Sequence, residues 1–526
     1  MTDPVTPAPF NSRLAILLAM AMFVLVVDTS LMNVSISAVV ADLGTTVSGV
    51  QGAIALEALV SAAFILIGGK TGDLIGRKLA YILGLLGYAV GAIAMTLAQD
   101  LTTILIFWAF IGGLGASLLL PSMQSLIHGN FEGAHQKRVY ALVGASAAIA
   151  AAVGPLLGGF ITTFLSWRVG FLLEAVIIGI VLAGIKLVRD VKYEGSRAVD
   201  WVGSALSVVG MGGIVLSILV WQEGGEYVAL LFAIGAVAMS GFVWWLVSRK
   251  RRARPTLIDP GLFASKLFRT GVSGQLLQQV ALGGTMIALP IYLQMVLEYN
   301  ALLAGLSIAP LSLSMFAVAL IAGRRTKGRP SNVIMIGFLL LVVGIGLLLP
   351  IIPRADSGWW LVVPLIIAGS GLGMLVSQLN NYTLSPITDE RVSEAAGVNS
   401  AAGSFGLSFG LAFAGAIMLA TLAFTFTSLT QASTVLPADD KQTIATVLEE
   451  DAQLMSNTQL LTLLESEPPE VQEEVVAIND EARPFALQVA LLVPLGAGLL
   501  GLLNAFRMRR LPDPKASSAA EGTLLG

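Results

Sequence analysis

Long apolar stretches, separated by short polar breaks, recur from one end of the chain to the other. Each is close to the ~20 residues of helix that cross a hydrocarbon core. The pattern predicts fourteen transmembrane helices, over residues 14–39, 50–69, 79–98, 103–126, 139–164, 168–187, 201–221, 227–248, 270–297, 301–322, 332–353, 358–380, 396–425 and 485–506. Because a spanning helix satisfies its own backbone hydrogen bonds in lipid, we expect an all-α polytopic membrane protein.

The composition narrows the class further. Of the 526 residues, 56% are hydrophobic and 12% are charged, about half the charged fraction of soluble domains. There is no cysteine, which excludes disulfides and thiolate chemistry. The two histidines, His128 and His135, lack zinc-binding spacing and are expected to be structural or solvated. We therefore expect no enzyme, no catalytic residue, no metal, no cofactor and no nucleic-acid partner.

The lysines and arginines predict the orientation. An even number of spans puts both termini on one side, and a cytoplasmic N-terminus leaves only four of the 30 cations outside, namely Arg168, Arg354, Lys441 and Arg483. This asymmetry follows the positive-inside rule. We expect a multi-pass protein of the plasma (inner) membrane with both termini cytoplasmic. The first apolar stretch is too long for a cleaved signal peptide and is expected to be retained.

A charged connector over residues 186–200 marks a boundary after the sixth span. The predicted organisation is an N-terminal six-helix bundle over residues 1–190, two inserted helices with cytoplasmic linkers over 191–268, a C-terminal six-helix bundle over 269–510 and a cytoplasmic tail over 511–526. This is a 6 + 2 + 6 arrangement of helices.

The C-terminal bundle includes a long outside loop, residues 426–484. Between residues 431 and 484 it holds 12 of the 33 acids and two cations. Helical spacing of apolar positions predicts short amphipathic helices; these positions are Ile444, Val447, Leu448, Leu454, Leu460, Leu461 and Leu464. The loop is either a lid or cation-attracting rim, or a solvated acidic cap without a role.

Three carboxyl groups lie inside predicted spans, whereas no lysine or arginine does away from the span ends. They are Asp28, Glu57 and Glu174. The helical rise of ~1.5 Å per residue puts Glu57 and Glu174 roughly 10 Å below the outer surface and Asp28 about 16 Å below it. Placing an ionised carboxylate at this depth in the membrane costs roughly a few kcal/mol or more of free energy. Each of the three is therefore expected to be protonated, hydrated or paired with a cationic ligand. A carboxyl without a fixed cation can carry a proton.

Uncharged polar side chains also lie inside spans. Asn33, Gln275, Gln278 and Gln279 are candidates for the lining of a cavity between the two six-helix units.

A polar break over residues 69–78 reads Gly-Lys-Thr-Gly-Asp-Leu-Ile-Gly-Arg-Lys. It is expected to form a tight aqueous turn. Asp73 lies near the negative end of its own helix dipole and needs a partner, which is Arg77, Lys78 or a helix N-terminus from the other half. The stretch resembles motif A of the major facilitator superfamily through Gly69, Asp73, Gly76, Arg77 and Lys78. If Asp73 contacts a helix of the other half only when the cytoplasmic side is closed, this stretch would act as a latch for that conformation.

The fifth and first spans extend the resemblance. Gly154, Pro155, Gly158 and Gly159 look like the core of motif C, which marks the antiporters of that superfamily. Small residues at four-residue spacing permit close helix approach, and the proline permits a bend. The sequence Val-Asp-Thr around Asp28, with Asn33, is similar to the Leu-Asp-x-Thr element of the fourteen-span drug:proton antiporter branch.

Two departures from the family pattern concern charge. The fourth span normally carries an arginine in Arg-x-x-Gln-Gly-x-Gly, and here Ala109 takes its place while Gly113 and Gly115 are kept. The second-half counterpart of motif A, residues 323–329, keeps its cations and has no acid. Coupling through the usual arginine is therefore not expected.

The resemblance covers nearly the whole chain and implies a major facilitator fold working by alternating access between two six-helix bundles. It implies a secondary active exporter of amphipathic or cationic compounds in exchange for protons, in contact with membrane lipids and without a required oligomer. For Asp28 it favours a functional role; Glu57 stays open, and Glu174, on a peripheral sixth span, is expected to be a structural acid. The alternatives are an exporter or flippase of lipid-like amphiphiles and, more remotely, a non-transporting receptor or scaffold.

Overall fold

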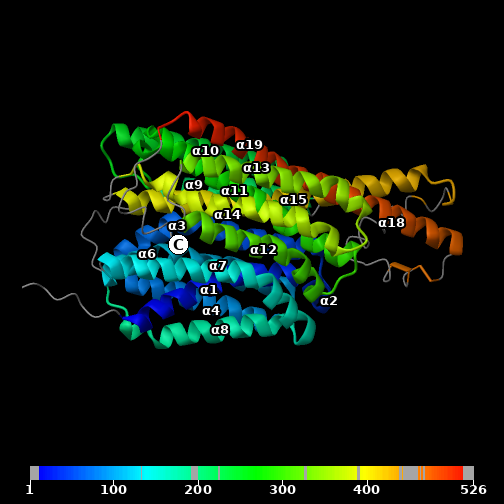
Figure 1. Ribbon diagram of the computed structural model, residues 1–526, viewed down its shortest axis with the longest axis horizontal. Helices are drawn as coiled ribbons and strands as arrows, with labels where there is room; N and C mark the ends of the chain where they lie inside the picture. The colour runs from blue at the N-terminus through cyan, green and yellow to red at the C-terminus, as the bar shows by residue number, and fades with distance from the viewer. Residues whose placement is uncertain are drawn as a thin grey trace, which may run out of the picture.

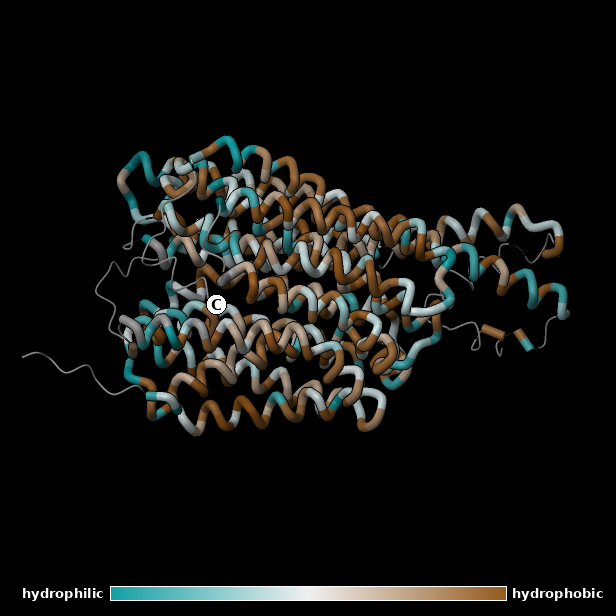
Figure 2. Tube along the Cα trace, viewed as in Figure 1, coloured by the Kyte–Doolittle hydropathy of each residue, from teal (hydrophilic) through white to brown (hydrophobic). Residues whose placement is uncertain are grey.

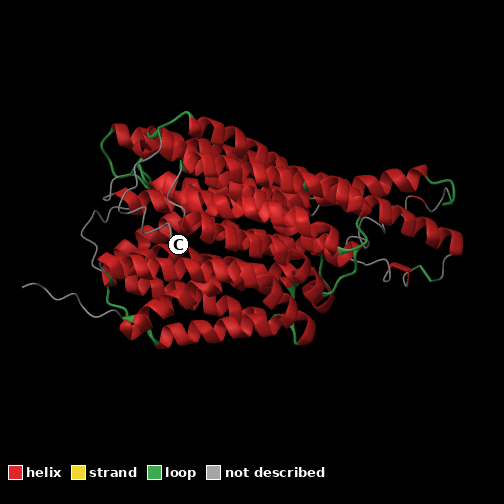
Figure 3. Cartoon of the chain, viewed as in Figure 1, coloured by secondary structure: helices red, strands yellow, loops and turns green. Residues whose placement is uncertain are grey.

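The computed structural model describes residues 11–131, 133–190, 200–222, 225–324, 329–387, 391–437, 441, 460–461, 464–465 and 468–512. Within these residues, fourteen helical segments are long and apolar enough to cross a membrane, which confirms the expected number of spans. They run side by side along the long axis of the molecule, and the described part of the chain contains no strand (Figures 1 and 3). The middle of the bundle is apolar and both ends carry the hydrophilic residues (Figure 2).

The first six spans form one set of mutually packed helices. Their elements are α1 (Ser12–Val34), α2 (Ile36–Leu43), α3 (Val47–Ile75), α4 (Arg77–Leu97), α5 (Leu101–Thr103), η1 (Ile104–Gly112), α6 (Gly113–Asn130), α7 (Gly133–Phe164), α8 (Trp167–Ala183) and η2 (Ile185–Leu187). Helix α1 packs against α7, both α3 and α4 pack against α6, and α8 lies against α1 and α4. The fourth span is unusual because η1 is a nine-residue π-helix, a rare conformation that often occurs at functional sites.

The seventh and eighth spans are α9 (Trp201–Gln222) and α10 (Val228–Arg251), and the last six follow the short η3 (Pro260–Ala264). The last six comprise α11 (Lys266–Ile291), η4 (Tyr292–Val296), α12 (Ala301–Arg324), α13 (Pro330–Ile351), η5 (Ile352–Arg354), η6 (Gly358–Leu361), α14 (Val362–Leu384), α15 (Val392–Ala432), α18 (Pro469–Ala490) and α19 (Leu492–Arg509). The two sets of six meet where α3 packs on α15 and where α7 packs on α12.

Helices α15 and α18 are longer than their apolar stretches predict, and their far ends extend beyond the other helices (Figure 1). Val471, Val475, Ile478 and Ala482 of α18 are buried at helical spacing, and α18 packs against α15. This part of the predicted outside loop is therefore a continuation of the last span, held by an apolar stripe. Of the positions expected in short amphipathic helices, those from Ile444 to Leu454 lie outside the described residues.

One buried carboxyl holds the two inserted helices together at their charged end. Asp200, at the start of α9, accepts hydrogen bonds from the backbone N–H of Gly203 at 3.0 Å and from Trp245 Nε1 of α10 at 2.9 Å. Arg249 of α10 lies 3.8 Å from the same carboxylate. Helix α9 also contacts both α3 and α15, so it lies along the line where these two helices from the two sets of six meet.

A second acid ties the inserted helices to α15. Asp259 pairs with Lys250 of α10 and, at 2.7 Å, with Arg391, while its backbone N–H donates to Glu394 at 2.6 Å. Burial alone would raise the pKa of Asp259, but the hydrogen bonds from Lys250 and from the N–H of Gly261 outweigh it. Together with the charge of Arg391, they hold the pKa of this carboxyl below its ordinary value.

We expect Asp259→Asn to lower the melting temperature of the purified protein by a few degrees at neutral pH. The amide keeps the shape but loses two largely solvated ion pairs, each contributing about 1 kcal/mol or less. A carboxyl whose pKa is lowered by folding stabilises the fold above its ordinary pKa and ceases to do so as the pH falls through its folded value. The difference from the wild type should therefore shrink below pH 3.8, and equal melting temperatures at neutral pH would contradict the assignment.

Candidate functional site

The centre of the first six spans contains a fully buried carboxyl with aromatic hydrogen-bond donors. Asp28 of α1 has no exposed surface. The Tyr88 hydroxyl of α4 donates to one of its oxygens, and Trp108 Nε1 lies 3.1 Å from both. Trp108 belongs to the π-helix η1, directly before the buried Ala109. The irregular turn thus presents an indole donor to α1 at the level of Asp28.

The structure brings the other two membrane carboxyls to the same region. Glu174 of α8 is 2% exposed, and its carboxyl lies within hydrogen-bonding reach of the Asp28 carboxyl. Glu57 of α3 is 8% exposed and interacts electrostatically with Asp28. Three helices therefore bring three acids into one region of the first six spans, and none of the three forms an ion pair with a lysine or arginine of the described chain.

Tyr88 and Trp108 were not among the residues selected from the sequence. In sequence, an aromatic residue within an apolar span is interpreted as a packing residue. Only the three-dimensional structure shows that Tyr88 and Trp108 face Asp28 and donate hydrogen bonds to it. One feature of the sequence points to Trp108: it directly precedes Ala109, which stands where the family pattern has an arginine.

The predicted glutamines lie in the other half of the chain, on α11. Gln278 is 1% exposed, and the side-chain oxygens of Gln278 and Gln279 receive no hydrogen bond from the described residues. Gln275 and Gln279 lie beside Gly403 of α15, where a Cβ would come 3.3 Å from Nε2 of Gln275 and 3.7 Å from Cγ of Gln279. Buried amide oxygens without donors are costly unless a ligand or water supplies one.

Asn33, on the same helix as Asp28, is 4% exposed, and its side-chain oxygen also lacks a donor among the described residues. It therefore resembles the α11 glutamines in its unmet hydrogen-bonding capacity, while lying on α1.

The stretch over residues 69–78 is packed within the first six spans. Asp73 pairs with Arg77 at 2.9 Å, the first of its three expected partners. Gly76 has φ of 100°, a conformation that side chains rarely adopt. Lys78 donates its backbone N–H to Asp190 at 3.0 Å and its Nζ to the carbonyl of Val188 at 2.8 Å.

The small residues of α7 pack two helices at once. Gly154 lies against Ser30 of α1, and a Cβ on Gly158 would come 2.9 Å from the Cα of Leu31. Gly159 faces the backbone of α12, where a Cβ would come 2.9 Å from the Cα of Leu302. The predicted antiporter motif therefore contacts both the helix that carries Asp28 and the opposite half.

Hydrogen bonds join the two halves near the predicted outer ends of the spans. Ser37 of α2 donates to Gln294 of η4, and the N–H of Leu302 donates to Thr163 of α7 at 3.0 Å. Deeper in the bundle, Ser408 of α15 donates to the carbonyl of Ala55 at 2.7 Å. These contacts hold the halves together on that side.

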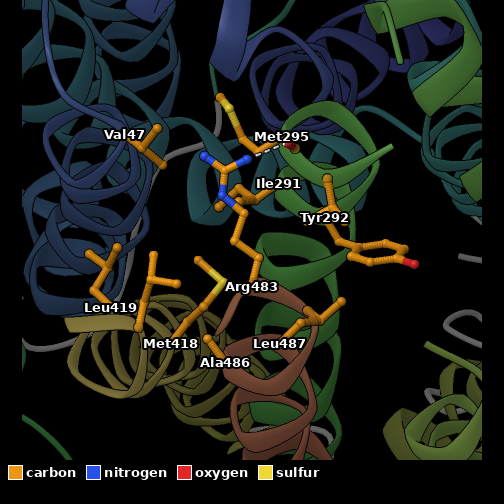
Figure 4. Close-up of a pocket in the computed structure, with 11 residues that line it drawn as sticks. Val47, Ile291, Tyr292, Met295, Met418, Leu419, Arg483, Ala486 and Leu487 are labelled. Carbon is orange, nitrogen blue, oxygen red and sulfur yellow. Dashed lines mark hydrogen bonds between the residues drawn. The ribbon is translucent and has the colours of Figure 1, made fainter. Parts of the chain in front are cut away.

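An apolar pocket with one cation lies at the same junction (Figure 4). Its walls come from α3, α11, η4, α15 and α18 and include Val47, Tyr292, Met418 and Leu487. Arg483 reaches across it and donates to the carbonyl of Met295 at 2.8 Å. A cation at the end of a helix satisfies a carbonyl left without an N–H partner, so Arg483 fastens α18 to the end of η4.

Comparison with known proteins assigns the family. The Major Facilitator Superfamily profile matches residues 18–201 and 192–411. The chain is 26% identical to the probable actinorhodin transporter of Streptomyces coelicolor, over 79% of this chain and 74% of that one. It is 29% identical to the puromycin resistance protein pur8 of Streptomyces alboniger, over 74% and 78%, and 27% identical to the drug efflux pump JefA of Mycobacterium tuberculosis, over 78% and 81%.

Solved structures agree on the fold. The proton:xylose symporter XylE aligns with a TM-score of 0.56 at 12% identity, covering 99% of this chain and 100% of that one. A peptide transporter POT in complex with sulfate aligns with a TM-score of 0.58 at 14% identity, over 89% and 97%. With its fourteen spans, this chain belongs to the Major Facilitator Superfamily and is a membrane transporter, not an enzyme.

Proposed function

We propose that this transporter exports amphipathic or cationic compounds across the plasma membrane in exchange for protons, with both termini in the cytoplasm. Export would proceed by alternating access, with the first and last six spans rocking about a central site. The names of its relatives, which refer to an antibiotic, resistance and drug efflux, support drug-like substrates.

The observation that carries the proposal is the group of three buried carboxyls that have no cationic partner among the described residues. Leaving Asp28, Glu57 and Glu174 all ionised in a low-dielectric interior would cost several kcal/mol or more by an order-of-magnitude estimate. The group is stabilised by binding protons or a cation, and exchange between these two is the chemistry of a proton-coupled exporter of cations.

The amide oxygens on α11 supply a second, complementary feature. Gln278 and Gln279 present acceptor oxygens that receive no hydrogen bond from the described residues, and such acceptors suit the N–H groups or the positive end of an amphipathic compound. The glutamines lie in the last six spans and the carboxyls in the first six, which favours a substrate held between the two halves.

Flux into proteoliposomes tests the proposal. A permanently charged, lipophilic quaternary ammonium dye cannot accumulate by simple proton trapping. Its uptake into liposomes, driven by an imposed pH gradient, therefore measures the exchange of dye for protons. One proton per cycle should sustain about a tenfold dye gradient for each pH unit, and an ionophore that collapses the pH gradient should release the dye. Liposomes without protein are the control.

Other outcomes point elsewhere. Movement of fluorescent phospholipids without movement of dyes or cations would replace the proposal with export of lipid-like amphiphiles. Saturable dye binding without flux in sealed vesicles would instead favour a receptor or scaffold.

A further inference from the structure

We propose that Asp28 and Glu174 hold one proton between them and gain or lose protons as a single unit. Glu174, on the sixth span, would then be half of the proton-carrying site and not a structural acid. The inference rests on the proton exchange proposed above and names the pair of side chains that performs it.

The hydrogen-bond donors around the pair are distributed unequally. Asp28 accepts from Tyr88, and Trp108 Nε1 lies 3.1 Å from both of its oxygens. Glu174 is equally deep, yet neither of its oxygens receives a hydrogen bond from an N–H or O–H group of the described residues. Donors stabilise a carboxylate, and their absence disfavours one. The negative charge therefore rests on Asp28 and the proton on Glu174.

Contact between the two carboxyls requires that proton. Two ionised carboxylates side by side in an apolar interior repel strongly, whereas a protonated acid donates a short, charge-assisted hydrogen bond to its partner. The Glu174 hydroxyl donating to Asp28 satisfies both groups. This arrangement gives Asp28 a further donor and gives Glu174 a partner that the rest of the described chain does not provide.

No lysine or arginine of the described residues pairs with either carboxyl. Around Asp28, α4 contributes Tyr88, η1 contributes Trp108, α8 contributes Glu174 and α3 contributes Glu57; α7 meets α1 at Gly154. Trp108 meets Phe171 edge-on at 6.2 Å, and Phe171 meets Trp167 at 6.1 Å.

The pair is also connected to the moving interface. Ser30 and Leu31, close to Asp28 on α1, touch Gly154 and Gly158 of α7, whose Gly159 touches α12. Rocking of the halves at α7 and α12 would shift α1 relative to α8 and so separate or rejoin the carboxyls. A separated Glu174 loses its acceptor and releases its proton to the open side; a returning proton or a bound cation restores neutrality.

Substrate-induced proton release from purified transporter, measured with a pH indicator in weak buffer, tests the pairing. We expect Glu174→Gln to reduce release to background, while exchange of labelled for unlabelled dye without a pH gradient continues. The double exchange Asp28→Glu with Glu174→Asp keeps two carboxyls and their combined length and should restore release. Asp28→Asn with Glu174→Asp should not restore it.

The pH profile separates a proton-carrying from a structural role. Wild-type exchange should vary with pH through the titration of the pair, and Glu174→Gln should flatten the profile without lowering the melting temperature enough to unfold the protein. Asp42→Asn is the matched control, because Asp42 is a partly exposed acid of the same half paired with Arg168; it should keep the wild-type profile.

The outcomes distinguish the two levels of the proposal. A wild type that shows no proton release and no pH-driven flux overturns the proposed function itself. A coupled wild type whose Glu174→Gln variant releases protons normally, or a double exchange that stays inactive while each single conservative variant works, overturns the pairing alone.

Discussion

Asp28→Asn is expected to abolish pH-driven accumulation of substrate while exchange of substrate for substrate continues. The amide has the shape of the carboxyl but cannot bind and release a proton, and its NH2 group faces the donors Tyr88 and Trp108. In proteoliposomes with a gradient of one pH unit, a wild type that exchanges one proton per cycle sustains about a tenfold substrate gradient. The variant should sustain none.

The matched control is again Asp42→Asn, the same chemical change in an acid that has a cationic partner. Asp42 pairs with Arg168 and accepts from Trp167 at 3.0 Å at the end of α8. Partly exposed pairs contribute little to stability, so this variant should accumulate substrate like the wild type. Persistent accumulation by Asp28→Asn would show that coupling does not pass through α1.

Sequence reasoning located the three acids but not the group they form. Their depth follows from counting residues along helices, since the rise per residue is constant. Which faces of α1, α3 and α8 meet depends on packing, and Glu174 was accordingly expected to be structural. Its contact with Asp28 becomes visible only when α8 lies against α1.

The aromatic partners were harder to anticipate for a different reason. A pattern based on 3.6 residues per turn assigns Trp108 to a face of a regular helix, whereas η1 winds as a π-helix over nine residues. The wider turn changes the direction of every side chain within it. The spacing of apolar positions does not predict a π-helix. The periodicity therefore could not indicate that Trp108 donates to Asp28.

The number of spans could be predicted, while the length of the last ones could not. A continuous apolar run marks only the part of a helix that lies in lipid. An amphipathic helix can continue into water if a partner helix covers its apolar stripe. In α18 the buried Val471 and Val475 supply that stripe, and α15 is the partner. The same residues, read without the partner, predicted only a polar outside loop.

The turn over residues 69–78 illustrates a choice that the sequence left open. The position of Asp73 at the C-terminal end of its helix required a cation or a helix N-terminus nearby, and three partners satisfied that requirement. Arg77, one helical turn further on, is the partner at 2.9 Å. It sits beyond Gly76, whose positive φ redirects the chain so that α4 begins immediately.

Gly159→Leu is expected to slow transport severalfold or more by disfavouring closure between α7 and α12. A Cβ at this position would come 2.9 Å from the Cα of Leu302, and backbone atoms cannot move aside as a flexible side chain can. Overpacking of this kind costs about 1–3 kcal/mol, which displaces an equilibrium between two conformations by about fivefold to more than a hundredfold. Alternating access needs both conformations, so a transporter that rarely closes at this junction cycles more slowly.

Cross-linking measures the displacement directly, because the chain has no cysteine of its own. In a background with Ser37→Cys and Gln294→Cys, whose native side chains meet across the halves, Gly159→Leu should lower the ratio of cross-linked to uncross-linked protein about tenfold, because that ratio follows the equilibrium between the closed and open conformations. Gly179→Leu on α8 is the matched control, since a Cβ there meets nothing within 4 Å. Equal cross-linking and transport in the two variants would show that α7 and α12 need not touch for the outer side to close.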